Sequence, residues 1–497
     1  MDFPVSLDSQ SETALHRQLY EEIRRAILSG RLPAGQRVPS TRSLSESLGI
    51  SRATVTLAYD YLLDEGYLQS ALGSGTYVCR QLPDELLRPL ATAKLATKKA
   101  KASEEVKVRG LSRYGAFLKE RPWLEFEETE PEFQFSFGRP DMTAFPMRQW
   151  QQLVNHHLKE RRFSLLDSPA NAAGYLPLRQ AIAQHLNKAR AVRCTAKQII
   201  IVNGSQQAID LVTRLFVDRG DFVGIEEPGY MGAKKAFEVQ GAKLIGFDVD
   251  DRGLVVDKLR DPALPPLKLL YVTPSHQFPT GVVLSLPRRL ELIARAKQTG
   301  TIIIEDDYDS EYRYSGRPVP ALAGLEHGGS VIYIGTFSKV LFPALRLGYL
   351  VVPPAMADLF TRAKWLSDRH SPLLDQQVLA DFIGMGHFER HVRKMRRLYQ
   401  ERRKQVIAAL KEQFGSEIEV LGDNAGINIL IRFRRALNEK ATLQAAKKLG
   451  VGLIGTANFY LQNAPSGEFL LNYGALTADE IGSGLARLAQ AVVYEKS

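Results

Sequence analysis

Lys339 stands where a lysine can act as a reactive amine rather than as a surface charge. It follows the apolar run Val331–Thr336 and precedes a second apolar stretch, so its amine is expected at a sheet edge, facing the interior. Burial disfavours the ammonium form and lowers the pKa, which a Schiff-base lysine requires. The hydroxyls of Thr336 and Ser338 and the guanidinium of Arg346 are near in sequence and suit a phosphate. The segment therefore predicts a reactive lysine beside an anion site.

Carboxylates follow a second buried strand, which is predicted at Thr301–Glu305. Asp306 and Tyr308 come just past its carboxyl end, where α/β sheets bind their ligands. Asp307 and Asp309 are interpreted instead as residues of a solvated acidic loop. The segment therefore adds one carboxylate and one phenol to the candidate site.

A third segment, Ile200–Ala208 (IIVNGSQQA), is typical of a strand, a turn and the start of a helix. Free backbone N–H groups at a helix start bind anions, and the hydroxyl of Ser205 adds a donor there. Taken alone the signal is weak, because many turns between a strand and a helix look like it.

A sheet is needed to bring these side chains together, and the sequence from about residue 126 onward predicts one. Short apolar strands alternate there with helical stretches, which is typical of a mostly parallel sheet covered by helices on both faces. The predicted strands are Ile199–Asn203, Phe222–Ile225, Leu269–Thr273, Thr301–Glu305, Val331–Thr336 and Arg346–Val352. After about Gly386, a long basic helix leads to a smaller α+β lobe with strands at Ile427–Arg432 and Glu468–Tyr473.

The first 80 residues predict a separate unit that is mainly α. Apolar residues recur at the i, i+4 spacing of an amphipathic helix over Thr13–Ser29. Ser40 and Ser51 are expected to cap two further helices, with the turn between them at Gly49. A β-hairpin is predicted over residues 67–78, which completes the pattern of a winged helix-turn-helix.

Charge and composition divide the chain further. Residues 1–80 and 126–497 are expected to be domains, the second with a small lobe from about residue 386, and residues 81–125 a flexible basic linker. The sequence has 65 Lys and Arg against 55 Asp and Glu, and the excess lies in Lys94–Lys101 and Phe388–Lys404. Each basic segment is either a solvated face or a source of non-specific contacts to DNA phosphates.

Length and composition restrict the class of protein. At roughly 150 residues per domain, 497 residues correspond to about three units. The two cysteines, Cys79 and Cys194, exclude a disulfide scaffold and a four-cysteine zinc site, and no metal is expected. No apolar run is long enough to cross a bilayer and no signal peptide is visible, so we expect a cytoplasmic protein without a membrane partner.

The segments around Lys339, Asp306 and Ser205 resemble those of the fold-type I aminotransferases, which use pyridoxal 5′-phosphate (PLP). Glu227–Tyr230 (EPGY) and Asn171–Arg179 (NAAGYLPLR) add to this resemblance. It implies an α/β fold with a large and a small lobe.

The N-terminal segment Arg37–Val78 looks like the winged helix of the GntR regulators. The combination of both domains, with Thr273–Gly281 (TPSHQFPTG) and EDDYDSEYRY, is similar to the MocR/GabR subfamily of transcription regulators. The resemblance covers nearly the whole chain except the linker. It implies a multidomain protein, in which a mainly α winged helix-turn-helix precedes an aminotransferase-like PLP-dependent fold of type I.

The resemblance implies a role for each site residue. Lys339 would form the Schiff base with PLP, and Asp306 would face the pyridine nitrogen and hold its proton, which makes the ring an electron sink. Tyr308 would reach the ring oxygen, and Tyr230 would stack on the ring face. The phosphate would be held by Ser205, Gln206, Thr336, Ser338 and Arg346.

Two positions depart from the pattern of catalytic aminotransferases. Phe278 stands before Pro-Thr-Gly, where the enzymes commonly carry an Asn that bonds the ring oxygen. Leu470 stands where they carry an Arg that clamps a substrate carboxylate, and Leu offers no charge-assisted bond. Arg432 or Arg434 is the alternative source of that clamp.

The resemblance to winged helices implies contacts with double-stranded DNA. The helix that begins after Ser51 would enter the major groove by its N-terminal end. The expected contacts to base edges or nearby phosphates come from Arg52, Thr54 and Thr56, those to the backbone from Ser40 and Arg42, and those of the wing tip from Gly73 and Gly75. Aminotransferase folds of this type pair as dimers, so a homodimer on two spaced half-sites is implied.

These expectations favour a PLP-dependent DNA-binding transcription regulator. Its aminotransferase-like domain would sense PLP or an amine effector through a Lys339 Schiff base and so switch promoter binding. The first alternative is an active aminotransferase with an accessory winged helix, against which Phe278 and Leu470 speak. The second is a DNA-binding protein whose other domain merely dimerises, which the retained Lys339, Asp306 and Tyr308 disfavour.

Overall fold

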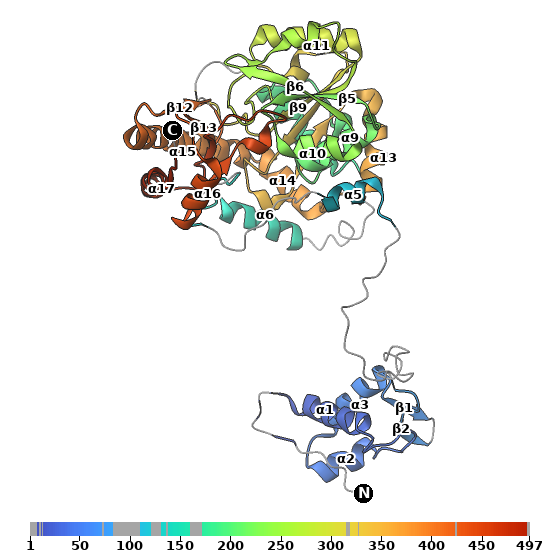
Figure 1. The fold of residues 1–497 in the computed structure, drawn as a ribbon. Helices are drawn as coiled ribbons and strands as arrows, with labels where there is room; N and C mark the ends of the chain where they lie inside the picture. The colour runs from blue at the N-terminus through green and yellow to red at the C-terminus, as the bar shows by residue number, and fades with distance from the viewer. Residues whose placement is uncertain are drawn as a thin grey trace. The chain divides into compact units, whose positions relative to one another are not determined.

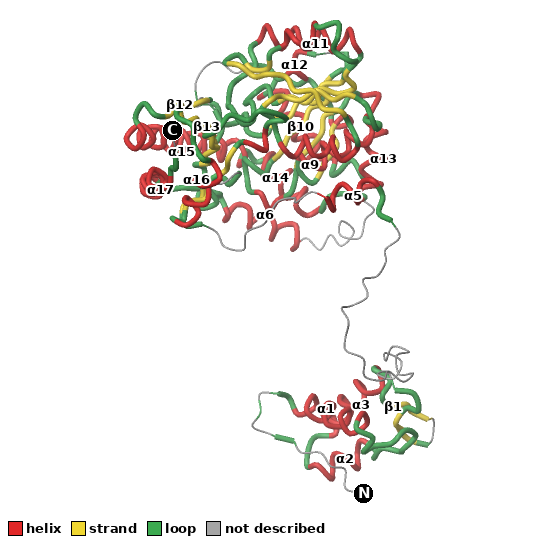
Figure 2. Tube along the Cα trace, in the orientation of Figure 1, coloured by secondary structure: helices red, strands yellow, loops and turns green. Residues whose placement is uncertain are grey.

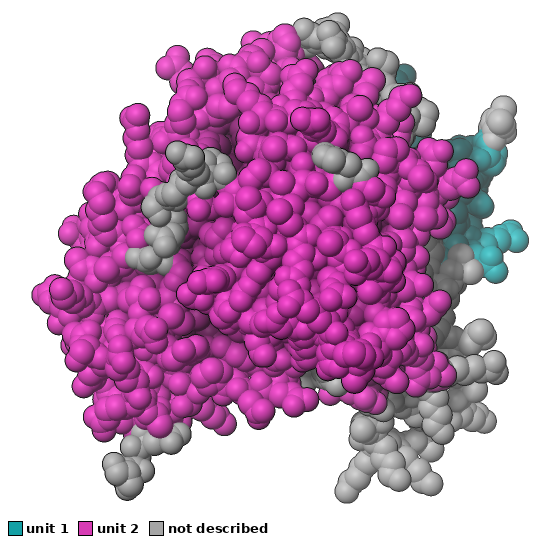
Figure 3. Space-filling view, turned by 90° about the horizontal axis from the view of Figure 1, so that it is seen from above, with its two compact units in different colours: residues 1–108 teal, residues 109–497 magenta. Residues whose placement is uncertain are grey.

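The computed structural model describes residues 7–8, 11, 13–71, 74–82, 110–120, 131–135, 138–159, 171–314, 319–326, 328–422 and 425–494. The chain divides into two compact units, residues 1–108 and 109–497 (Figure 3). Most of the linker predicted at residues 81–125 lies outside the described residues, as do its basic stretch Lys94–Lys101 and the wing-tip residue Gly73.

In its described residues, the smaller unit has three helices and a two-stranded hairpin (Figure 1). Its elements are α1 (Leu15–Leu28), α2 (Thr41–Leu48), α3 (Arg52–Asp64), β1 (Leu68–Ala71) and β2 (Gly75–Val78). Ser40 and Ser51 cap α2 and α3 by accepting hydrogen bonds from the backbone N–H of Ser43 and Thr54, each at 3.1 Å. The left-handed backbone of Gly49, with φ of 67°, ends α2. The predicted order of helix, helix, helix and hairpin is confirmed.

The larger unit is built on an eight-stranded sheet with the order β4-β11-β10-β9-β8-β5-β6-β7. The central strands β10, β9, β8, β5 and β6 are parallel, whereas β11 and β7 run antiparallel to their neighbours. The strands are β4 (Ile199–Val202), β5 (Phe222–Glu227), β6 (Lys243–Asp250), β7 (Gly253–Leu254), β8 (Leu267–Val272), β9 (Ile302–Asp307), β10 (Val331–Thr336) and β11 (Gly348–Val351).

Helices cover this sheet on both sides (Figure 2). The described helices of the larger unit before the small lobe are α5 (Arg113–Glu120), α6 (Met147–Lys159), α8 (Leu176–Ala189), α9 (Ser205–Phe216), α10 (Met231–Gln240), α11 (Leu286–Thr299), α12 (Leu322–Leu325), α13 (Ala357–Asp368) and α14 (Leu373–Gly384). Adjacent residues of β9 serve opposite faces, because strand side chains alternate. Ile304 packs with Ile209 of α9, whereas Ile303 packs with Leu292 of α11.

Several predicted strand boundaries shift by one to two residues, and the shifts of β9 and β11 affect the candidate site. β9 runs to Asp307 rather than ending at Glu305, so Asp306 and Asp307 are strand residues whose side chains point to opposite faces. β11 begins at Gly348 rather than at Arg346, and Arg346 lies in the preceding turn with φ of 49°.

The small lobe has a four-stranded sheet with the order β12-β13-β16-β15. Its elements are α15 (His387–Phe414), β12 (Ile418–Leu421), β13 (Asn428–Phe433), α16 (Glu439–Lys448), β15 (Ile454–Gly455), β16 (Glu468–Asn472) and α17 (Ala478–Ala491). A separate pair joins β14 (Val451–Gly452) to β3 (Phe133–Gln134) in parallel. The basic segment Phe388–Lys404 forms the first part of α15, where Met395 and Tyr399 are buried while Arg393 and Arg397 are exposed.

One ion pair ties α15 to the segment that precedes α6. Arg402 donates Nη2 to Asp141 Oδ2 at 2.6 Å, and its Nη1 donates to the carbonyl of Gly474 after β16. Burial alone would raise the pKa of Asp141, but the hydrogen bonds from Thr143 and Arg402 outweigh burial and lower it. None of the described helices is long and apolar enough to cross a membrane.

Replacing Arg402 by Met should destabilise the larger unit strongly, because it leaves Asp141 buried without its cation. Breaking a buried pair in this way costs about 3–5 kcal/mol. Because the folded pKa of Asp141 is lowered, the pair stabilises the fold above the ordinary aspartate range, and this stabilisation is lost as the pH falls through the folded pKa. Urea unfolding at pH 7 and at a pH below about 3, under the ordinary aspartate pKa of about 3.9, measures the effect, with the exposed Lys404→Met as the matched control at about 0.5 kcal/mol or less.

Candidate functional site

All nine residues predicted to bind the cofactor line one cavity of about 250 Å³ in the larger unit. Strand β9 and the residue after it supply Asp306 and Tyr308, and the turn after β10 supplies Ser338 and Lys339. The others are Thr336 at the end of β10, Ser205 and Gln206 at the start of α9, Tyr230 before α10, and Arg346 before β11. The cavity therefore lies at the carboxyl ends of the parallel strands, as the sequence predicts.

Lys339 lies in the turn after β10, with its side chain partly exposed to the cavity. A Cβ added at Gly138 would collide with its Nζ, so the absence of a side chain at Gly138 makes room for the amine. Burial lowers the pKa of Lys339 to about 8, although the carboxylates of Asp309 and Asp306 oppose the shift. A substantial fraction of the amine is therefore neutral near physiological pH.

Asp306 projects from β9 into the same cavity. Its Oδ2 accepts a hydrogen bond from Tyr271 Oη at 2.6 Å, whereas its buried Oδ1 has no hydrogen-bond partner among the described residues. Burial raises the pKa of Asp306 to about 7, against the effect of the Tyr271 hydrogen bond. A buried acceptor without a partner at a cavity wall fits a ligand that brings an N–H donor.

The opposite part of the cavity has the chemistry of an anion site. Helix α9 begins at Ser205, and its first backbone N–H groups are donors to an anion. Arg346 Nη2 donates to the carbonyl of Asn203 at 2.8 Å. A Cβ at Gly204 would lie 3.0 Å from that Nη2, so glycine lets the guanidinium approach the helix start. The hydroxyls of Thr336 and Ser338 complete the cradle.

Two tyrosines flank the cavity. The Tyr230 ring meets Phe278 edge-on with centroids 5.7 Å apart, and its hydroxyl lies 3.5 Å from Gln206 Oε1. Tyr308 Oη lies 3.2 Å from His276 Nδ1, which itself bonds Asp309 at 2.8 Å. The Tyr308 phenol is therefore oriented by a buried His–Asp pair that the sequence did not reveal.

The interpretation of Asp307 and Asp309 as a solvated acidic loop is wrong. Their exposed fractions are 6% and 1%. Asp307 accepts from Arg190 Nε at 2.8 Å and from Tyr333 Oη at 2.6 Å. Asp307 is buried because β9 continues past Glu305 to this residue, and Asp309 bonds the buried ring of His276.

The two positions that depart from catalytic aminotransferases lie in one apolar cluster. Phe278 packs with Leu430, Phe459 and Leu470, and Tyr230 contacts the same cluster. Arg432 pairs with Glu468 through Nε at 2.7 Å, and neither Arg432 nor Arg434 is among the residues that line the cavity. Arg346 is the one arginine among the described lining residues.

Sequence reasoning missed two polar lining residues, Tyr271 and Thr273. Both belong to the run from β8 into the following turn, and Thr273 Oγ1 donates to the buried carboxylate of Glu226 at 2.6 Å. A phenol inside the apolar strand Leu267–Val272 was the available signal, because buried hydroxyls need a hydrogen-bond partner.

In the smaller unit, the predicted DNA-contacting residues gather where α2 and α3 begin. Arg52 and Thr56 are exposed, and Arg52 Nε lies 3.4 Å from Thr41 Oγ1 of α2. Thr54 is half-buried and bonds the Ser51 hydroxyl at 2.8 Å.

The side chains of two other predicted DNA contacts already have partners within the smaller unit. Ser40 uses its hydroxyl as a helix cap, and Arg42 pairs with Glu46 at 3.0 Å. In the wing, Arg37 lies against Gly75, where a Cβ would come within 2.7 Å of Arg37 Nε. Arg37 is exposed, and the sequence did not identify it as a contact.

Comparison with known proteins assigns both units. Residues 15–78 match the gntR family of bacterial regulatory proteins, and residues 141–488 match aminotransferase class I and II. The chain is 39% identical to the probable rhizopine catabolism regulatory protein MocR of Rhizobium meliloti, covering 99% of this chain and 96% of that protein. It is 30% identical to the pyridoxine biosynthesis transcriptional regulator PdxR of Corynebacterium glutamicum, covering 99% of both.

The larger unit also resembles solved aminotransferases. The kynurenine aminotransferase of Pyrococcus horikoshii, solved in complex with PMP, superposes with a TM-score of 0.68 at 28% identity. The match covers 78% of this chain and 95% of the enzyme. The predicted fold class, a winged helix-turn-helix followed by a fold-type I aminotransferase-like domain, is confirmed.

The lowered pKa of Lys339 predicts unusual reactivity. After hydroxylamine treatment to remove bound carbonyl compounds, reductive methylation of Lys339 should reach its half-maximal rate near pH 8, because the neutral amine is the nucleophile. A lysine model peptide with the ordinary pKa of about 10.4, added to the same reaction, gives the reference curve. Mass spectrometry of peptides at successive pH values measures both, and coincident curves would contradict a buried amine.

Proposed function

The chain belongs to the MocR family of GntR-type DNA-binding transcription regulators, and from that premise we propose that its larger unit binds PLP through Lys339 and that PLP occupancy sets the affinity of the protein for its promoter. Three observations on the cavity support PLP: an amine at Lys339 whose pKa is lowered to about 8, a buried Asp306 oxygen that lacks a partner among the described residues, and an anion cradle at the start of α9.

Each of these groups would meet a different part of PLP. When bound, PLP supplies an aldehyde for the lysine amine and an aromatic ring that accepts electrons. Asp306 would hold the proton of the ring nitrogen on its unpartnered oxygen, and Tyr308, oriented by His276, would bond the ring oxygen. Tyr230 would cover the ring, and the phosphate would lie between Arg346 and the backbone and side chain of Ser205. Gln206, Thr336 and Ser338 would complete that phosphate site.

PLP itself is the signal that this cavity favours over an amino acid. Phe278 lines the cavity and belongs to an apolar cluster with Leu430 and Leu470, so this part of the wall is apolar. A carboxylate held there would lose hydrogen bonds to a charged group that are worth about 1.5–3 kcal/mol each. Arg346, the arginine of the described lining, stands at the phosphate end. An amine effector without a carboxylate is the second candidate.

In the smaller unit, the start of α3 would enter the major groove. Arg52, Thr54 and Thr56 would contact base edges or nearby phosphates, because the N-terminal residues of a recognition helix reach the bases. Ser40 and Arg42 at the start of α2 and Gly75 of the wing would contact the backbone. A homodimer would present two such units to two spaced half-sites.

The central test measures operator affinity with and without PLP. Duplexes selected by the full-length protein from random sequences serve as operators, and fluorescence anisotropy gives Kd. PLP should change the Kd of the wild type by about fivefold or more, the usual range of coupling between two sites. Lys339→Ala should abolish the change, whereas the exposed Lys404→Ala should preserve it.

Further arms of the same test separate the alternatives. An added effect of amines beyond that of PLP would indicate an amine effector. Rapid conversion of bound PLP to the pyridoxamine form by an amino acid would instead favour the aminotransferase alternative. An unchanged Kd in every arm would overturn the proposal.

The DNA contact of Arg52 is tested separately. Arg52→Ala should weaken operator binding by about tenfold and, if Arg52 meets a phosphate, reduce the slope of log K against log salt concentration by about 1. The control is Arg31→Ala, since Arg31 is exposed but lies after α1 rather than at the start of α3. Equal effects of both substitutions would contradict a specific DNA contact of Arg52 and would show that it contributes only to the general surface charge.

A further inference from the structure

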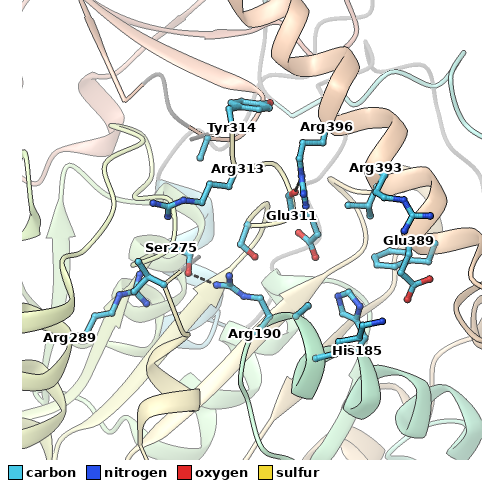
Figure 4. Close-up of a pocket in the computed structure, with 17 residues that line it drawn as sticks. His185, Arg190, Ser275, Arg289, Glu311, Arg313, Tyr314, Glu389, Arg393 and Arg396 are labelled. Carbon is cyan, nitrogen blue, oxygen red and sulfur yellow. Dashed lines mark hydrogen bonds between the residues drawn. The ribbon is translucent and has the colours of Figure 1, made fainter. Parts of the chain in front are cut away.

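A second and larger cavity of about 460 Å³ lies in the larger unit (Figure 4). Its walls come from the end of α8, from the segment after β9 and from the first half of α15. None of its described lining residues also lines the cavity that contains Lys339. A volume of this size is within the range of sites for small organic ligands, about 300–1,000 Å³.

The wall of this second cavity is rich in positive charge. Arg190 and Arg313 lie on one side, and Arg393 and Arg396 reach in from α15 on the other (Figure 4). The described lining contains six basic residues and two acidic ones. The basic residues are Lys188, Arg190, Arg289, Arg313, Arg393 and Arg396, and the acidic ones are Glu311 and Glu389.

Two of these arginines already have buried partners. Arg190 pairs with Asp307 at 2.7 Å and donates to Ser275 Oγ at 2.6 Å. Arg289 is fully buried, donates to three backbone carbonyls and lies 3.9 Å from Glu305. These pairs provide partners for the charges of Arg190 and Arg289.

The two arginines of α15 are placed differently. Arg396 donates Nε to the carbonyl of Glu311 at 3.0 Å, which holds the side chain in the cavity and leaves its terminal nitrogens for another acceptor. Arg393 forms no salt bridge with any described residue. Guanidinium groups on facing walls are suited to bidentate contacts with a carboxylate or phosphate.

The acidic residues do not cancel this excess. Burial raises the pKa of Glu311 to about 7, and the nearby Asp307 carboxylate adds to the shift. Near neutral pH a substantial fraction of Glu311 is therefore uncharged and can donate a hydrogen bond. Glu389 has a buried Oε2 without a hydrogen-bond partner among the described residues. A ligand with an anionic group and a hydroxyl could place the anion on the arginines and the hydroxyl near these two glutamates.

We propose that this second cavity binds a small organic dianion, either a phosphate monoester or a dicarboxylate. Arg393 and Arg396 would hold one charged group, and Arg313 with the hydroxyl of Ser275 would meet the other end. This binding does not depend on the proposed PLP function, because the two cavities share no described lining residue.

Calorimetric titration of the full-length protein with phenyl phosphate, with glutarate and with glycerol as the neutral control tests the proposal. We expect phenyl phosphate or glutarate to bind, with a Kd of about 1 mM or lower at low salt. The double variant R393Q/R396Q should weaken that binding by about tenfold or more, because each lost hydrogen bond is charge-assisted. The matched control R390Q/R397Q removes two charges from the same helix outside the cavity and should stay within about twofold.

The titrations are run on PLP-free and on PLP-saturated protein, so that failure of PLP binding and failure of dianion binding are seen separately. Binding of phenyl phosphate alone identifies a phosphate monoester as the ligand class, and binding of glutarate alone identifies a dicarboxylate. Absence of binding by both probes at about 10 mM would overturn the proposal. Equal loss in the two double variants would also overturn it, because it would reflect only the general charge of α15.

Discussion

Three consecutive buried carboxylates at the end of β9 impose the constraint on which the larger unit depends. Glu305, Asp306 and Asp307 are 0%, 4% and 6% exposed. Removing a carboxylate from water costs several kcal/mol unless partners compensate it. Glu305 accepts two backbone N–H groups at the start of α12, and Asp307 accepts from Arg190. Asp306 accepts from Tyr271 and has a second oxygen without a partner among the described residues.

The alternation of the strand separates these roles. Glu305 and Asp307 face one side of the sheet, where they anchor Arg289 and Arg190, and Asp306 faces the cavity on the other side. Burial penalises whichever form is charged, so it raises the pKa of Asp306 to about 7 and lowers that of Lys339 to about 8. An acid and an amine in one cavity are thereby both brought close to neutral pH.

The sequence predicts the parts that local pattern and motif determine. The capped helices of the smaller unit, the alternating strands and the segments around Lys339 are all visible in it, because each depends on neighbouring residues. The burial of Asp307 and Asp309 is not predictable in that way. Arg190 is 117 residues from Asp307, and His276 is 33 residues from Asp309. Such pairs become visible only when the sheet order brings distant segments together.

The contrast between the polar and apolar lining of the Lys339 cavity bears on how a ligand can act. Lys339, Asp306 and the start of α9 offer polar groups to a ligand, whereas the lining residue Phe278 is already packed in an apolar cluster with Leu470. A ligand shifts a conformational equilibrium only by the difference of its affinity for the two states. That difference must therefore arise at the amine, the unpartnered Asp306 oxygen and the start of α9, all of which a single PLP molecule would reach. Under the proposed function, PLP would supply partners to these polar groups on binding, without any turnover.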